Sequence, residues 1–132
     1  MKATNFTIFV SLLLTYSWLA IPAHAAEQIE VRYADLEWRD DVFSLAGKPF
    51  TGIARDTHKD GKPKALYPFS EGRLHGVVRE WWDNGQISTE THFEKGLRHG
   101  LNRYWSRTGQ LMKEQIYEHD KSVSEKHFDT KG

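Results

Sequence analysis

Two histidines, His75 and His99, have side chains that suggest chemistry, because imidazole nitrogens bind metal ions and titrate near neutral pH. Metal sites use closely spaced ligands, such as two histidines with a short spacer and converging carboxylates or thiolates. His75 and His99 are far apart in the chain, and each precedes a glycine at a position where turn residues are expected. The sequence therefore predicts two exposed turn histidines and no metal site.

Patterns that indicate catalysis are missing from the sequence. It contains no nucleophile beside a base at motif spacing, no G-x-S-x-G, no phosphate-cradling glycine loop and no paired carboxylate motif. It also has no cysteine, which excludes thiol chemistry, a disulfide framework and lipid attachment through cysteine. We predict no catalytic residue, no enzyme activity and no cofactor. A triad assembled from different strands is the alternative that a sequence leaves open.

Arginine and aromatic side chains are better candidates, because Trp, Tyr and Arg dominate protein–protein hot spots. Arg55, Arg79 and Arg103 recur at a constant 24-residue spacing. Their guanidinium groups would repel one another unless they are paired with carboxylates or bind an acidic partner. Two interpretations remain. The arginine stems lie across an apolar face, stacked on tryptophans, or the guanidinium groups contact a partner directly.

Two aromatic residues, Trp82 and Tyr104, break the 24-residue pattern. Trp82 aligns with Ser106, and Tyr104 aligns with Glu80. Stacking of repeats alone does not require rings at these positions, so we predict that both are exposed. The predicted partner-binding residues are Arg79, Trp82, Arg103 and Tyr104.

A repeating unit with this 24-residue period must position these side chains. Six glycines predicted to be structural turn residues keep the period: Gly52, Gly61, Gly76, Gly85, Gly100 and Gly109. Residues 72–95 and 96–119 agree at nine of 24 aligned positions. Repeats of this length are supersecondary units that bury surface by stacking on their neighbours. We therefore expect function on an extended surface rather than in a pocket.

Each repeat reads as a β-hairpin. Residues 76–82 are rich in β-branched and aromatic side chains, residues 86–93 alternate strictly, and Asp83-Asn84-Gly85 separates them. Asn-Gly between two such runs predicts a primed turn with positive φ. The first repeat is degenerate, because Pro63 and Pro68 remove hydrogen-bond donors, which favours an edge or bulged strand. The predicted fold is all-β, an elongated antiparallel sheet in a single layer, built from stacked hairpins.

Strand alternation assigns the faces of this sheet. Counting from the turn, it places Arg79 on one apolar face with Trp81, Ile87 and Phe93, and it places Glu90 on the opposite, mixed face. The corresponding residues of the third repeat follow the same rule. The arginines and the glutamates are therefore predicted on different faces.

The boundaries follow from these patterns. Residues 1–25 read as a secretory signal peptide, with Lys2, an uncharged apolar run over residues 6–21 and an Ala23-His24-Ala25 cleavage signature. A retained membrane anchor is the alternative, but the run is shorter than the ~20 residues of a membrane span. Residues 26–46 are predicted as an N-terminal segment with a capping hairpin, residues 47–119 as three repeats, and residues 120–132 as a C-terminal strand with a frayed tail.

The net charge of the chain limits the kind of partner that it can bind. Removing residues 1–25 takes away Lys2 and no acidic residue, which leaves 17 basic against 18 acidic residues. Nucleic-acid binders carry a strongly basic stripe or domain, so we predict no nucleic-acid partner. The near-neutral charge also weakens attachment to anionic lipids, which usually needs a polybasic cluster.

Several motifs resemble the bacterial variant of the MORN repeat over roughly residues 36–119. They are Pro49-Phe50-Thr51-Gly52, Gly72-Arg73-Leu74-His75-Gly76, Trp81-Trp82-Asp83-Asn84-Gly85-Gln86 and Gly96-Leu97-Arg98-His99-Gly100. The third unit departs from the pattern, with Arg107-Thr108-Gly109 in place of Asn-Gly and with Asp120 where the next glycine would fall. The resemblance implies stacked hairpins and a binding module. Bacterial relatives are often labelled antitoxin-like, and the wider class is associated with membrane attachment and scaffolding.

The sequence thus predicts a non-enzymatic module, exported to the periplasm or secreted after cleavage at about Ala25-Ala26. It would bind another protein through one face of its sheet, as an antitoxin or immunity-type neutraliser. The alternative from a second class is an envelope or membrane-surface scaffold on anionic lipid headgroups. A hydrolase acting on envelope polymers is the third.

Overall fold

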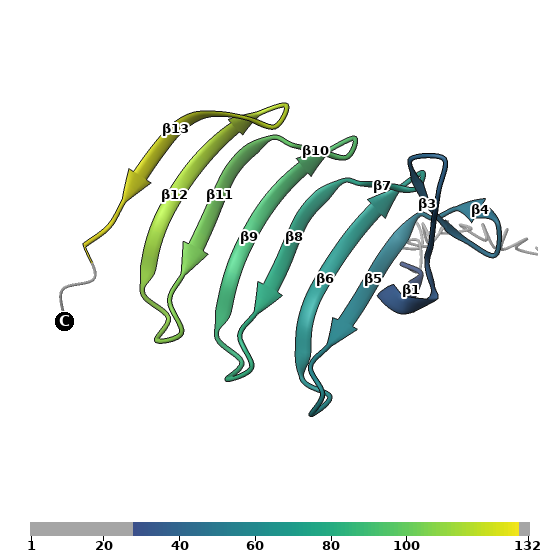
Figure 1. The fold of residues 1–132 in the computed structure, drawn as a ribbon, viewed down its shortest axis with the longest axis horizontal. Coiled ribbons are helices and arrows are strands. Elements are labelled where there is room, and N and C mark those ends of the chain that lie inside the picture. Colours follow the sequence, from purple (N-terminus) through teal and green to yellow (C-terminus); the bar gives the residue numbers. More distant parts are fainter. Residues whose placement is uncertain (1–27, 130–132) are drawn as a thin grey trace, which may run out of the picture.

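The computed structural model describes residues 28–129, which form a long, single-layered sheet with a small second sheet at its N-terminal end (Figure 1). The strands of the main sheet are β1 (Glu30–Arg32), β5 (Gly52–Thr57), β6 (Pro63–Ser70), β7 (Arg73–Leu74), β8 (Gly76–Trp81), β9 (Ile87–Glu94), β10 (Leu97–Arg98), β11 (Gly100–Trp105), β12 (Leu111–Glu118) and β13 (Lys121–His127). The predicted signal peptide lies outside the described residues. Within them, no helix has the length and apolar character needed to cross a membrane.

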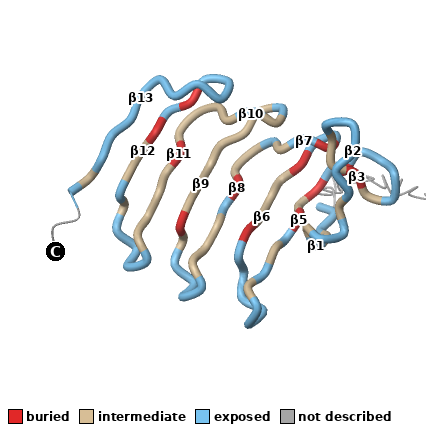
Figure 2. Tube along the Cα trace, in the orientation of Figure 1, coloured by how far each residue is buried: buried red, intermediate tan, exposed pale blue. Residues whose placement is uncertain are grey.

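The main sheet follows the order β1-β5-β6-β8-β9-β11-β12-β13, so hairpin follows hairpin along the chain. The described strand pairs are antiparallel except β1 with β5, which is parallel. The all-β prediction of stacked hairpin repeats is confirmed. The expected last strand is also present as β13, which is exposed along its whole length (Figure 2). β6 pairs with strands on both sides, so the proline-containing strand is an interior one, with Pro63 at its start beside a register shift.

The hairpin loops form one edge of the sheet, called here the loop edge. Each is a three-residue loop: Trp82 N–H donates to Gln86 O at 2.8 Å and Gly85 N–H donates to Trp82 O at 2.9 Å. Residues 58–62 and 106–110 repeat this pattern. Gly85 has a φ of +84°, whereas Asn84 keeps a negative φ. The prediction of a primed turn at Asn84-Gly85 is therefore wrong. The loop is instead a turn followed by a glycine in the left-handed conformation, a geometry typical of three-residue loops.

Primed turns occur instead at the opposite edge, called here the linker edge, where one hairpin passes to the next. Both residues have positive φ in Glu71-Gly72, Lys95-Gly96 and His119-Asp120, which recur with the period of the repeat. Two successive residues with positive φ define the tight turn that matches strand twist. Gly61, Gly85 and Gly109 are thus turn glycines as expected, whereas Gly52, Gly76 and Gly100 are the first residues of strands.

A β-bulge in each repeat overturns the predicted assignment of faces. Trp81 pairs with Ile87, but the neighbouring residue Glu80 pairs with Thr89, so Ser88 is the extra residue. An extra residue reverses the alternation for the rest of the strand. Arg79 therefore lies opposite Glu90, on the same face, and Phe93 lies on the other face. The same shift occurs between Tyr104 and Trp105 and between Asp56 and Thr57.

The N-terminal segment caps the first repeat. After β1 come a 3-10 helix (Tyr33–Asp35) and a small sheet of β2 (Glu37–Arg39), β3 (Val42–Leu45) and β4 (Lys48–Pro49). The hairpin expected within residues 26–46 is formed by β2 and β3, with Asp40-Asp41 as its turn. The hydrophobic core lies here: Phe50, Ala54 and Phe69 are buried, with Tyr33, Phe43 and other apolar side chains packed on them. Gly52 leaves no room for a side chain, because an added Cβ would lie 2.3 Å from Ile29 O.

Candidate functional site

The sheet has two faces, which are named here by their side chains. The arginine face carries Arg55, Arg79, Arg103, Glu90 and Glu114. The tyrosine face carries Ala54, Tyr67, Phe69, Val78, Phe93, Asn102, Tyr104 and Tyr117. Either face could receive a partner, so the two are considered in turn.

Every predicted arginine of the 24-residue series is paired with a carboxylate. Arg79 Nε donates to Glu90 at 2.9 Å, and Arg103 Nε donates to Glu114 at 3.1 Å. Glu90 also lies 4.0 Å from Arg103 Nη1, so the charges alternate across neighbouring strands. These contacts contradict the expectation that the glutamates lie on the opposite face. The guanidinium groups pair with glutamates instead of stacking on tryptophans.

The third arginine, Arg55, forms a two-pronged ion pair with Glu30 of β1, at 2.7 and 2.6 Å. The hydrogen bonds from Arg55 lower the pKa of Glu30, because they stabilise the charged carboxylate. This pair spans the one parallel contact of the described sheet. The arginine face is thus neutralised internally along the whole series.

The tyrosine face of the first repeat is covered by the N-terminal segment. Tyr33 packs on Tyr67 with ring centroids 4.8 Å apart, and Phe43 packs on Phe69 at 5.0 Å. Burial, followed by the nearby carboxylate of Glu80, raises the pKa of Tyr67 to about 12. The aromatic rings on the tyrosine face of the first repeat therefore pack against the protein's own N-terminal segment.

The same face continues over the second and third repeats beyond this cover. Phe93 and Tyr117 occupy the repeat positions equivalent to Phe69; Phe93 is half-buried and Tyr117 is buried, and Tyr104 lies on the same face in β11. Arg98 lies 4.3 Å over the ring of Tyr117, and Lys113 lies 4.4 Å over that of Tyr104. Burial and the neighbouring Tyr117 raise the pKa of Tyr104. This part of the face is a mixture of rings and cations.

A groove of about 260 Å³ marks the border of the cover. Trp38 and Phe43 of the cap form one side, and Leu74 and Leu97 of the linker edge form the other. Trp38 is 60% exposed although it stacks on Phe43 at 4.7 Å. Sequence reasoning named the cap around Trp38 only as a second place to look for the binding surface, and it missed Leu97, because neither residue belongs to a repeated series.

The four predicted partner-binding residues do not form one site. Arg79 and Arg103 share the arginine face, Tyr104 lies on the tyrosine face, and Trp82 lies at the loop edge. Trp82 is half-buried rather than exposed: its Nε1–H donates to Trp105 O at 3.2 Å, and Arg107 lies 5.2 Å over its ring. Tyr104 is also half-buried.

Among residues 28–129, one group of side chains has the composition of a metal site: Glu94, His99 and His119. The structure does not bring His75 and His99 together; it brings His99 beside His119, with ring centroids 4.9 Å apart. Sequence spacing could not show this, because His119 aligns with Lys95 and not with a histidine.

Two segments of the chain, residues 74–95 and 98–119, match the family model of the MORN repeat variant. They correspond to the second and third repeats, and the matches support a place in the MORN-repeat family. MORN repeats are generally non-enzymatic repeat modules that mediate protein or membrane-lipid interactions. No curated protein and no solved structure matches the chain.

Proposed function

We propose that this protein is a binding module whose tyrosine face on the second and third repeats receives a protein partner. The observation that carries the proposal is the cover over the first repeat. There, Tyr33 and Phe43 of the N-terminal segment pack on Tyr67 and Phe69, and Phe69 is buried while Tyr67 is partly buried. The chain itself thus supplies an example of how a polypeptide docks on this face.

The rings of the later repeats are suited to the same contact. Phe93 and Tyr104 are half-buried on this face and keep part of their rings accessible, whereas Tyr117 is 7% exposed and lies beneath Arg98. Tyrosine, with arginine and tryptophan, is enriched in interface hot spots, where a rigid ring becomes desolvated. A partner segment that carries aromatic side chains, as the cap does with Tyr33 and Phe43, would extend the cover from the groove at Trp38 along the sheet.

The arginine face supports the membrane alternative less well. Attachment to anionic headgroups needs cations that are free to bind lipid phosphates. Arg55, Arg79 and Arg103 are held by Glu30, Glu90 and Glu114 instead. The scaffold on anionic lipid headgroups therefore remains the second candidate and an outcome of the test.

Export belongs to the proposal as well. The charge-free run before Ala23-His24-Ala25 favours cleavage after Ala25 and release into the periplasm or medium. In that compartment, a small non-enzymatic binder would act by occupying a surface of another protein, as an antitoxin or immunity-type neutraliser does. Sequencing of the mature N-terminus tests the export step separately from binding.

The binding step is tested with two matched variants in the third repeat. Tyr104→Ala removes a ring from the tyrosine face, whereas Ile116→Ala removes an apolar side chain, 42% exposed, from the arginine face. The wild type is used to capture partners from the organism's envelope fraction, and the captured protein is then titrated with each variant. We expect at least a tenfold loss of affinity for Tyr104→Ala, because a hot-spot ring contributes about 2 kcal/mol or more, and little change for Ile116→Ala.

The reverse order of effects would place the interface on the arginine face and refute the proposal. Salt-sensitive binding to vesicles of anionic phospholipid, with no protein captured, would favour the scaffold alternative. Circular dichroism should show that both variants remain folded at the temperature of the titration, which separates lost contacts from lost folding.

A further inference from the structure

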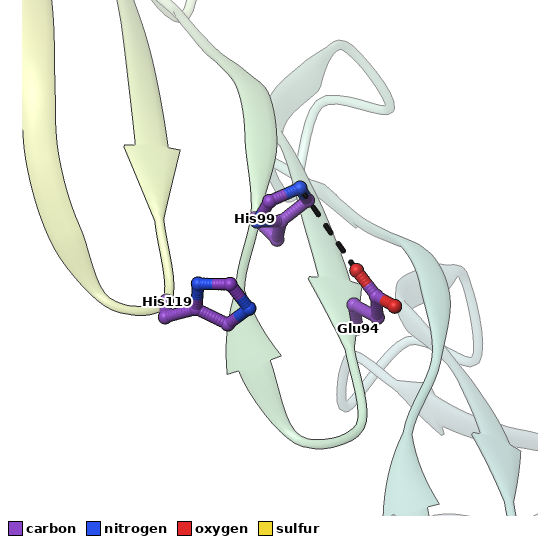
Figure 3. A group of neighbouring side chains, drawn as sticks. All are labelled: Glu94, His99 and His119. Carbon is purple, nitrogen blue, oxygen red and sulfur yellow. Dashed lines mark ion pairs between the residues drawn. The ribbon is translucent and has the colours of Figure 1, made fainter.

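The linker edge between the second and third repeats brings together two imidazoles and a carboxylate. Glu94 ends β9, His99 precedes β11, and His119 is the first residue of the turn between β12 and β13. Figure 3 shows the three side chains approaching one another from these neighbouring segments. Glu94 Oε2 and His99 Nε2 are 3.9 Å apart, and one ligand atom from each residue lies within 4.8 Å of the others.

The backbone around this group is fixed from both sides. His99 N–H donates to His92 O at 2.9 Å, which holds the linker to β9. The turn is held to the linker by Asp120, whose carboxylate accepts from Arg98 N–H at 3.0 Å and from Arg98 Nε at 2.9 Å. Asp120 N–H also donates to Arg98 O at 2.9 Å. His119 is therefore placed beside His99 by its neighbour in the turn, and Arg98 of the linker is already paired with Asp120.

The side chains themselves are not used by the fold. His99 Nδ1 is buried and has no hydrogen-bond partner within residues 28–129, and its Nε2 faces Glu94 beyond hydrogen-bond distance. The side chains of Glu94 and His99 are 46% and 40% exposed. A hydrated cation can therefore reach both side chains.

We propose that Glu94, His99 and His119 form a binding site for a zinc-class divalent cation. Two imidazoles and one carboxylate, without thiolates, suit Zn²⁺ and its first-row neighbours rather than Mg²⁺ or Ca²⁺, which prefer oxygen ligands. Ligand atoms in a tetrahedral zinc site are about 3.3 Å apart, given Zn–N and Zn–O distances of about 2.0–2.1 Å. The observed separations would shorten to this value if the exposed side chains of Glu94 and His119 turned toward His99, and the fourth position would be left to water.

The preceding junction shows what the site requires. His75 occupies the repeat position of His99, but Ser70 and Lys95 stand where Glu94 and His119 do. A hydroxyl and an ammonium group at these places cannot complete a metal site. The chain therefore contains an internal control, with the same backbone and one imidazole.

Binding of the cation would tie β9, the linker before β11 and the β12–β13 turn to one another. β13 is the outermost strand, and it pairs only with β12 among the described strands. The cation would thus add a cross-link to the end of the array that the N-terminal cap does not reach. This inference does not depend on the proposed partner surface.

The test uses the full-length chain, purified without a histidine tag and freed of metal with a chelator. Isothermal titration with ZnCl₂ measures affinity and stoichiometry, and imidazole NMR signals identify the ligands. We expect one Zn²⁺ per chain, with shifts at His99 and His119. The melting temperature should rise on the order of 10 °C when free Zn²⁺ is 100 times the dissociation constant.

Two variants decide the assignment. His119→Asn keeps a residue that tolerates positive φ in the turn. It should weaken Zn²⁺ binding at least about 100-fold, because loss of a hydrogen-bond partner of a metal ligand already costs about 10–100-fold and loss of a ligand costs more. His75→Asn should leave binding unchanged. No binding by the wild type, binding retained by His119→Asn, or equal losses in both variants would overturn the proposal. Circular dichroism shows whether each variant remains folded.

Discussion

Replacing Trp82 by alanine should destabilise the fold, contrary to the expectation from sequence that this ring is dispensable. The indole joins the second repeat to the third through its hydrogen bond to Trp105 O and through the stacked Arg107. In the first repeat, His58 occupies the same position, and its Nε2 lies 3.1 Å from Trp81 O. The residue that opens each of these two loops thus contacts the tryptophan that ends the next hairpin's first strand.

The magnitude follows from the contacts of Trp82. A fully buried tryptophan costs about 3–5 kcal/mol when it is cut to alanine, so a half-buried one costs about 2 kcal/mol. The hydrogen bond contributes about 1 kcal/mol, and an exposed cation–π contact about 0.5–1 kcal/mol. Because these contributions overlap, we expect a total of about 2–3 kcal/mol. For a domain of this size, that lowers the melting temperature by about 10–20 °C.

Thermal melts followed by circular dichroism provide the measurement. Trp82→Phe keeps a ring and removes only the donor, so it should lose about 1 kcal/mol. Trp38→Ala removes the more exposed tryptophan of the cap and should lose no more than about 1 kcal/mol. A Trp82→Ala protein that melts within about 3 °C of the wild type, less than the shift for about 1 kcal/mol, would refute the idea that this side chain couples the repeats.

Two further predictions concern backbone and charge. Gly52→Ala should destabilise the protein more than Gly85→Ala in thermal melts. Both positions have positive φ, but only at Gly52 would the new Cβ meet Ile29 O. Equal losses of stability in the two variants would exclude this clash as the cause. The hydrogen bonds from Arg98 lower the pKa of Asp120 from 3.8, so their stabilisation is present above that pH and is lost as the pH falls through the lowered value. Melting temperatures at pH 6 and pH 3 should therefore differ less for Asp120→Asn than for the wild type, and an unchanged difference would show that this pair does not contribute.

The sequence predicted the architecture correctly, because the 24-residue period fixes which segments are equivalent. Strand and turn residues recur with that period, and the hairpin order needs no long-range information. The face of the sheet on which each side chain lies was not predictable in the same way. It depends on a single extra residue, Ser88, whose presence in a bulge leaves no mark in an alternating strand. One residue thus moved Glu90 to the face of Arg79.

The type of turn in each hairpin loop was also not predictable from the residues alone. Asp83-Asn84-Gly85 has the composition of a primed turn, but the three-residue loop needs only the glycine in the left-handed conformation. Primed turns form instead at Glu71-Gly72 and Lys95-Gly96, where a long side chain precedes the glycine, and at His119-Asp120, which has no glycine. Composition alone could not rank these alternatives, because the loop length is set by where the strands stop pairing.

Departures from the repeat carry information that its regular positions do not. Ser106 stands where Trp82 would be repeated, and the reason is positional: within the described residues no further hairpin loop follows at the loop edge, so no carbonyl is offered to an indole. Asp120 stands where Gly96 would be repeated, and it accepts the strain of a φ of +67° while its carboxylate holds Arg98. The same turn places His119 beside His99. At Ser106, His119 and Asp120 the last repeat therefore differs from its neighbours where its contacts also differ, and at such positions a function specific to this chain, rather than to the array, should be sought.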